Sequence, residues 1–118
     1  MKKFNIKKRL VSCHEYNESD MVDYVIKCLD DNMNIGLVTD QGTPIISDPG
    51  FIVAREIIKK GYNVISLPGA TAFTVALVGS GLDTHKFVFE GFLDRDKKLR
   101  RKRLEEIQEE DRTMIFYE

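Results

Sequence analysis

The sequence predicts an α/β fold with a mainly parallel sheet and helices on both faces. Short runs of β-branched and aliphatic residues alternate with helical segments along the 118-residue chain, which is typical of βαβ units. Glycine and proline gather where strands give way to helices. Parallel sheets normally have both faces covered, whereas the predicted helices would leave a thin core. We therefore expect an incomplete α/β domain followed by the start of a second α/β domain.

The first part of the chain alternates predicted strands with two predicted helices. The three strands are Arg9–Ser12, Ile35–Thr39 and Asn63–Leu67. The first helix has Ser19 as its N-cap, and apolar residues recur at helical spacing up to Leu29. The second helix spans Phe51–Lys60, with Gly61 as its stop.

The second part begins with a helix of small residues over Thr71–Ser80, closed by Gly81. A strand (Lys86–Glu90), a charged helix (Lys97–Glu110) and a final strand (Thr113–Tyr117) follow. Composition changes near residue 84. Before it, apolar segments are separated by loops that contain glycine and proline; after it, the strands are rich in aromatic residues and charged residues are frequent. This change predicts one domain over residues 1–84 and the beginning of another over 85–118. We interpret the aromatic residues after the boundary as core and interface residues rather than base-stacking platforms: Phe87, Phe89, Phe92, Phe116 and Tyr117.

Composition and charge exclude several classes of protein. Lys and Arg total 18 and Asp and Glu total 19, a net charge of −1, so nucleic-acid contact would need a local basic patch. The apolar runs are shorter than the roughly 20 residues of a membrane span, and the N-terminus lacks the apolar core of a signal peptide. Cys13 and Cys28 are too few for a disulfide framework or a zinc site. We expect a reducing, cytoplasmic setting, no membrane and no metal.

Two loops hold all three prolines and three of the eight glycines: Asp40–Gly50 and Pro68–Ala72. Each follows the carboxyl end of a predicted strand, where open α/β sheets bind ligands. Thr71 could cap the next helix and direct its N–H groups toward the same crevice. The alternative is that Asp-Pro-Gly and Pro-Gly are ordinary turns, and that Asp40 only ties down its loop. Neither a dinucleotide fingerprint nor a P-loop is present.

A basic run lies at residues 95–103, and acids follow it at 105–111. On a helix that starts near Asp96 this order opposes the macrodipole, so helix stability does not explain it and phosphate contact is favoured. The alternative is a solvated face with Arg101–Glu105 and Lys102–Glu106 pairs at i,i+4 spacing. The candidate phosphate-binding residues are Arg100, Arg101 and Arg103.

Five segments in order resemble the tetrapyrrole (corrin/porphyrin) methylase superfamily. They are HEYNE (14–18), TDQGTPIISDPGF (39–51), SLPGATA (66–72), FEGFL with the following RRKRLEE (89–93 and 100–106), and TMIFYE (113–118). Within the superfamily they resemble the branch that methylates a cytidine ribose 2′-oxygen in small-subunit (16S) ribosomal RNA. One such segment is weak evidence, but five cover almost the whole chain.

The resemblance implies S-adenosylmethionine as cofactor. Gly42-Thr43-Pro44 stands where the family has a Gly-Asp-Pro loop that contacts this cofactor, and Pro68–Ala72 matches the family's second cofactor loop. Thr43 in place of the aspartate makes a corrin or porphyrin substrate less fitting. The implied cofactor-binding residues are Asp40, Gly42, Thr43, Pro44, Ile46, Thr71 and Ala72.

Two family features are not found in this sequence. The family opens with a strand and a Pro-Ile-Gly-Asn-type loop that forms another wall of the pocket, and it continues into a second domain beyond the strand matched by TMIFYE. The resemblance therefore implies the central part of such an enzyme, of doubtful activity by itself. Family enzymes pair as dimers, which implies a homodimer.

A ribose 2′-hydroxyl is a poor nucleophile, so a nearby base would help its methylation. His14 is the candidate, with Glu15 or Glu18 as partner and Asn17 as a positioning group. The alternative is a surface histidine, with Glu18 and Ser19 as helix caps; His85, in a turn with Asp83, is interpreted as structural. Three functions remain open: an RNA 2′-O-methyltransferase acting on the small ribosomal subunit, a methylase of tetrapyrroles or other small molecules, and a non-catalytic fragment that binds RNA or a partner.

Overall fold

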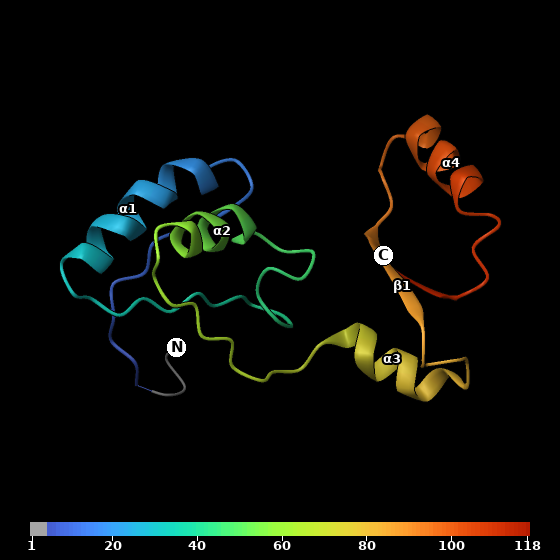
Figure 1. The fold of residues 1–118 in the computed structure, drawn as a ribbon, viewed down its shortest axis with the longest axis horizontal. Coiled ribbons are helices and arrows are strands. Elements are labelled where there is room, and N and C mark those ends of the chain that lie inside the picture. Colours follow the sequence, from blue (N-terminus) through green and yellow to red (C-terminus); the bar gives the residue numbers. More distant parts are fainter. Residues whose placement is uncertain (1–4) are drawn as a thin grey trace. The chain divides into compact units, whose positions relative to one another are not determined.

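The computed structural model describes residues 5–118 and contains four helices and two strands (Figure 1). The chain divides into two compact units. The first comprises residues up to Leu37 together with Asp48–Ser66, and the second comprises Val38–Ser47 together with Leu67–Glu118. Helices and parallel strands alternate in the second unit, which confirms the α/β class for an incomplete domain.

Two helices, α1 (Glu18–Asp30) and α2 (Phe51–Lys59), pack on each other in the first unit. Their buried apolar residues are Val25, Cys28 and Val53. Helix α2 is followed by Gly61 at φ +88°, where a side chain would be strained, so the predicted glycine stop is confirmed. Ser19 is not the N-cap of α1, because the helix starts one residue earlier and Asn17 holds that position.

Four elements form the second unit: α3 (Ala72–Ser80), β1 (Phe87–Phe92), α4 (Lys97–Glu106) and β2 (Thr113–Tyr117). The strands β1 and β2 pair in parallel with α4 between them in sequence, which is a βαβ unit. Helix α3 packs on β2. Phe73 stacks on Phe89 at 4.7 Å between ring centroids, and Phe89 meets Tyr117 edge-on at 5.0 Å. These contacts support the interpretation of Phe89 and Tyr117 as packing residues. Phe87 and Phe92, which were predicted with them, are 39% and 59% exposed, so they are not buried in a core here.

The three strands predicted in the first part of the chain are wrong. Within residues 5–118 the ladder joins only β1 and β2, and the segments Arg9–Ser12, Ile35–Thr39 and Asn63–Leu67 pair with nothing. Ile65 and Leu67, expected to be buried, are 81% and 80% exposed. A strand exists only through the hydrogen bonds of its neighbours, so apolar patterning alone does not make one.

Two predicted element ends also differ from the structure. Helix α4 ends at Glu106 rather than Glu110, because the chain turns at the buried residue Ile107. Strand β1 runs two residues beyond Glu90 through a bulge. None of the described helices is long and apolar enough to cross a membrane.

Candidate functional site

The two glycine- and proline-containing loops meet in the second unit through Thr43. Its hydroxyl donates a hydrogen bond to the carbonyl of Ala70 at 3.1 Å and lies 2.7 Å from the hydroxyl of Thr71. Gly69 lies beside the same hydroxyl, since a Cβ built there would be 3.7 Å from it. One side chain of the first loop therefore fixes three consecutive residues of the second, as expected if both loops serve one crevice.

Thr71 occupies the N-cap position of α3, as predicted, but its side chain accepts no hydrogen bond from the first turn of that helix. The hydroxyl faces Thr43 instead, and the Thr71 carbonyl accepts a hydrogen bond from the Thr74 hydroxyl at 2.7 Å. The residue thus joins the loops rather than capping the helix.

The other predicted cofactor residues lie along the same two loops. Asp40, Gly42, Ile46 and Ala72 are exposed, whereas Pro44 is half-buried. Gly42 has φ +70°, and a Cβ at this position would meet nothing within 4 Å. The backbone at Gly42 is therefore open to an approaching ligand in a conformation that a side chain would strain.

The chemistry of this loop pair suits a nucleoside with an amino-acid tail. The Asp40 carboxylate can accept hydrogen bonds from ribose hydroxyls or an ammonium group, and the Thr43 and Thr71 hydroxyls can both donate and accept. A separate apolar groove lies between α3 and β2, lined by Ala76, Leu77, Ser80, Leu82, Thr113, Met114, Ile115 and Phe116. No predicted cofactor residue lines that groove. Within residues 5–118, no group of three or more His, Cys, Asp or Glu side chains is placed to hold a metal ion.

His14 is an exposed residue of the first unit. Its backbone N–H donates to the side-chain oxygen of Asn17 at 2.7 Å, and the Asn17 amide donates to the carbonyl of Ser12 at 3.0 Å. Asn17 therefore shapes the turn and does not hold the imidazole ring.

Glu18 is engaged elsewhere and does not partner His14. This buried carboxylate accepts a hydrogen bond from the backbone N–H of Ile52 at 2.9 Å, in the first turn of α2. A negative charge at a helix N-terminus is favourable, so Glu18 is a cap, as the alternative interpretation proposed, but a cap of the neighbouring helix. His85 interacts with Asp83 at 2.9 Å within an exposed turn, as its structural interpretation expects. This contact lowers the pKa of Asp83, whose carboxylate accepts hydrogen bonds from the backbone and ring of His85.

The basic run lies on α4, whose N-cap Asp96 accepts hydrogen bonds from the N–H groups of Lys98 and Leu99 at 2.8 and 3.1 Å. No residue of the helix is buried. The i,i+4 pairs are present, at 3.3 Å for Arg101–Glu105 and 3.8 Å for Lys102–Glu106, and all four side chains are largely exposed. Exposed pairs of this kind contribute little stability, so they leave the cationic groups accessible to a polyanion.

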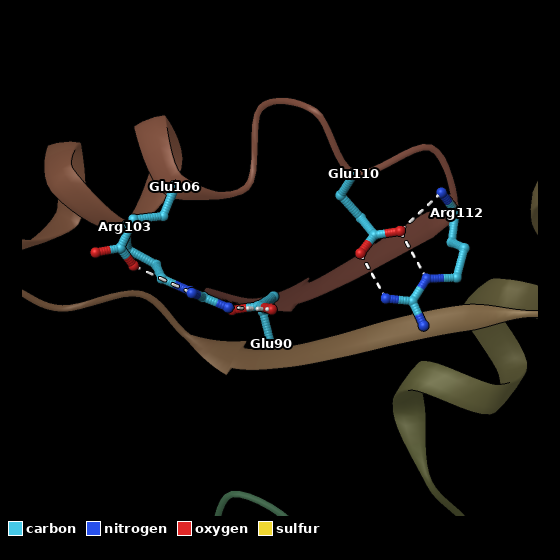
Figure 2. A network of polar contacts seen from close by, with 5 residues as sticks. All are labelled: Glu90, Arg103, Glu106, Glu110 and Arg112. Carbon is cyan, nitrogen blue, oxygen red and sulfur yellow. Dashed lines mark hydrogen bonds and ion pairs between the residues drawn. The ribbon is translucent and has the colours of Figure 1, made fainter.

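Arg103 differs from the other two candidate arginines, as Figure 2 shows. Its Nε and Nη2 atoms donate to the two carboxylate oxygens of Glu90 on β1 at 2.9 and 2.8 Å, and its Nη1 donates to Glu106 at 3.2 Å. The guanidinium holds the pKa of Glu90 below its usual value. Nearby, Arg112 makes a second bidentate pair and lowers the pKa of Glu110 to about 2.

Glu90 and Gly91 are not among the residues predicted from the sequence. Glu90 stands thirteen residues before Arg103, too far for a helical pair, and only the parallel βαβ arrangement brings the two together. The sequence held one weak sign of their role. A glycine inside a strand often marks a bulge or a close approach of the backbone, and Gly91 follows an acidic residue within an aromatic strand.

Comparison with known proteins shows which family the chain resembles. Residues 2–118 match the family model "Tetrapyrrole (Corrin/Porphyrin) Methylases". Over 98% of the chain, similar proteins named "Ribosomal RNA small subunit methyltransferase I" include those of Haemophilus influenzae at 45% identity, Halalkalibacterium halodurans at 48% and Escherichia coli O157:H7 at 42%. The chain spans 40–41% of the length of these relatives. Because the family model matches nearly every residue, the chain belongs to the tetrapyrrole (corrin/porphyrin) methylase family.

Proposed function

We propose that this chain is the central segment of an enzyme that transfers a methyl group from S-adenosylmethionine to the 2′-oxygen of a cytidine ribose in small-subunit (16S) ribosomal RNA. The observation that carries the proposal is the similarity of 98% of the chain to relatives named as small-subunit ribosomal RNA methyltransferases. The contact of Thr43 with the second loop supports it, because it gathers the predicted cofactor residues in one unit.

We assign the cofactor to the loop pair. Asp40 would accept from the ribose hydroxyls or the amino group, and the open backbone at Gly42 and the side chains of Pro44 and Ile46 would line its surface. Thr71 and Ala72 would close the other side. S-adenosylmethionine supplies an electrophilic methyl group on a sulfonium, so the task of these residues is to hold the donor in line with the acceptor oxygen.

The RNA would be held through its phosphates by Arg100 and Arg101 on α4, of which Arg100 is half-buried and Arg101 is 83% exposed. His14 remains the candidate base that would take the proton of the 2′-hydroxyl. Residues 1–84 would form part of the cofactor-binding domain and residues 85–118 the start of the second. The complete enzyme would act in the cytoplasm as a homodimer.

The test uses the full-length protein that carries this chain, methyl-labelled S-adenosylmethionine, and small ribosomal subunits that lack the modification. Label on a single cytidine ribose of the 16S RNA is the expected result. Cofactor binding without labelled RNA would contradict the substrate and favour a small-molecule methylase. Absence of cofactor binding would contradict the enzyme assignment and favour a non-catalytic role.

The loop assignment has its own test in the same protein. Gly42→Val should abolish cofactor binding in calorimetry, because the side chain would occupy the open face of the loop and strain a backbone with φ +70°. Asp40→Ala should weaken binding through loss of the acceptor. Gly81→Val is the matched control, since Gly81 also has a positive φ (+74°) and a Cβ there also meets nothing within 4 Å, but the residue lies outside both loops. Unchanged affinity in Gly42→Val would contradict the loop assignment.

A further inference from the structure

A bulge in β1 lies between the basic helix and the candidate cofactor loop. Phe89 is opposite Ile115 on β2, but the next residue in register, opposite Phe116, is Gly91. Glu90 is therefore the extra residue of the bulge. Gly91 has φ +65°, a conformation typical of glycine in a bulged strand. Bulges change the direction of side chains locally, and here two consecutive residues make contacts with two different parts of the second unit.

Glu90 connects the bulge to α4. Its side chain is only 11% exposed, and both of its carboxylate oxygens accept from the Arg103 guanidinium. Paired hydrogen bonds of this geometry fix orientation as well as distance. Among the described elements, α4 packs on no other helix or strand and buries none of its own residues. The bidentate pair, drawn in Figure 2, is therefore the specific side-chain link that orients the helix on the sheet.

Gly91 connects the same bulge to the first candidate cofactor loop, Asp40–Gly50, at Ser47. A Cβ at Gly91 would lie 2.8 Å from the Ser47 Oγ, a separation that forces one of the two to move. Ser47 and Ile45 themselves have φ +53° and +76°, conformations that are sparsely populated for residues with side chains. The surroundings must therefore hold this part of the loop in place, and the close approach at Gly91 is one such restraint.

We propose that the Glu90–Gly91 bulge is a positioning element that sets the basic helix and the cofactor loop relative to each other. Glu90 orients α4 through Arg103, and Gly91 seats the loop through Ser47. Arg103 is thereby a positioning residue, and phosphate contact is left to Arg100 and Arg101. The inference rests on the proposed function. Because methyl transfer requires an in-line approach, a displacement of about 1 Å can cost up to roughly 100-fold in rate.

The first experiment measures methyl transfer to the small ribosomal subunit by the full-length protein. Glu90→Gln and Arg103→Lys should each lower kcat/KM at least tenfold, while the dissociation constant for S-adenosylmethionine stays within twofold. Combining Glu90→Arg with Arg103→Glu should recover part of that loss. Glu110→Gln is the matched control for activity, since it breaks another bidentate pair, with Arg112, and frees no proposed phosphate contact; it should remain within twofold. Glu105→Gln, which breaks an exposed pair on α4 that does not reach β1, is the control for the exchange measurement.

A direct phosphate contact by Arg103 would give a different result. If Arg103 contacted phosphate directly, Glu90→Gln would free its guanidinium and tighten subunit binding. Tighter binding, or an unchanged kcat/KM, would overturn the role given to Glu90.

Amide hydrogen exchange gives a readout that does not depend on activity. Glu90→Gln should increase the amide exchange rates of residues 97–106 relative to Glu105→Gln. Equal rates in the two variants would overturn the role given to the Glu90–Arg103 pair. If the wild-type protein labels no RNA, the proposed function fails, while the exchange result still decides whether the bulge orients α4.

The loop half of the proposal is tested by cofactor calorimetry. Gly91→Ala should raise the dissociation constant at least fivefold, and adding Ser47→Gly should restore part of the affinity by removing the Oγ that the new Cβ would meet. Gly79→Ala should leave affinity unchanged. Recovery in the double variant separates the contact with Ser47 from the backbone strain of an alanine at φ +65°. Wild-type affinity in Gly91→Ala would overturn the role given to Gly91.

Discussion

Helices α1 and α4 are similar in length but attached by different forces. Helix α1 packs on α2 and buries Val25 and Cys28. Helix α4 buries none of its own residues; the pair between Arg103 and Glu90 joins it to β1, and the buried residue Ile107 follows its last turn. Apolar packing responds weakly to pH and salt, whereas charged contacts respond strongly. The first arrangement suits a scaffold, and the second leaves a row of cations available for a ligand.

The largest expected effect is on the packed helix. Val25→Ala should lower the free energy of unfolding by about 1.5–3 kcal/mol, since this side chain is 7% exposed. Urea denaturation measures the change. Val75→Ala on α3, at 70% exposure, should cost less than roughly 0.5 kcal/mol. An equal cost at Val75 would contradict its exposure and show that α3 is covered in the complete protein.

On α4, removing charge should change binding rather than stability. The double variant Arg100→Ala/Arg101→Ala should reduce the slope of log affinity against log salt by about 1.4–1.8, which corresponds to two phosphate contacts. Binding of the small ribosomal subunit between low and moderate salt gives the slope. Lys27→Ala, in the last turn of α1, is the control and should leave it unchanged. An unaltered slope in the double variant would favour the solvated-face interpretation.

As pH falls, α4 should lose its contact with β1 before α1 loses its contact with α2. Arg103 lowers the pKa of Glu90 from its ordinary 4.5, so the pair contributes stability above that value and loses it as pH falls through the lower, folded-state pKa. Amide chemical shifts of residues 97–106 should therefore move below pH 4.5 toward those of Glu90→Gln. The variant should lack the part of this change that Glu90 causes and keep the part caused by the carboxylates that both proteins share on α4, those of Asp96, Glu105 and Glu106. Simultaneous loss of both helices would mean that the pair does not place α4 independently.

The smallest effect belongs to the exposed pair Arg101–Glu105. A double-mutant cycle should give roughly 0.2–0.5 kcal/mol, as for other i,i+4 pairs, and the value should fall in high salt. The same cycle on Glu90 and Arg103 should give more, because Glu90 is only 11% exposed. Equal coupling energies would remove the distinction between the two pairs.

Local signals predicted the helices well and the strands unevenly. Apolar spacing and flanking glycines located the ends of α2 and α3 to within one residue and those of α1 to within two, because helical hydrogen bonds are made within the segment. The final strand, Thr113–Tyr117, was also predicted correctly. The same apolar patterning at Ile35–Thr39 and Asn63–Leu67 failed, because a strand depends on partners that a local pattern does not specify.

In the candidate site too, features carried by local motifs were predicted and features that need distant partners were not. Both loops match family motifs, which assigned Thr43 and Thr71 to one crevice. The second argument for that crevice failed, because within residues 5–118 the strands predicted before the two loops pair with nothing. Arg103 was grouped with Arg100 and Arg101, because a run of like charges gives no sign of which member has an ionic partner elsewhere. Glu18 was one of two predicted partners of His14, with a capping role as the alternative, and only the packing of α1 on α2 shows that its carboxylate caps α2.

By itself, the sequence determined the helices, the α/β class, the family and the two loops, since these depend on local patterns and motifs read along the chain. Only the tertiary structure decided which charges are paired, where the bulge lies and which apolar segments join a ladder. Those features depend on contacts between residues far apart in the chain, and the parallel pairing of β1 and β2 is what brings Glu90 to Arg103.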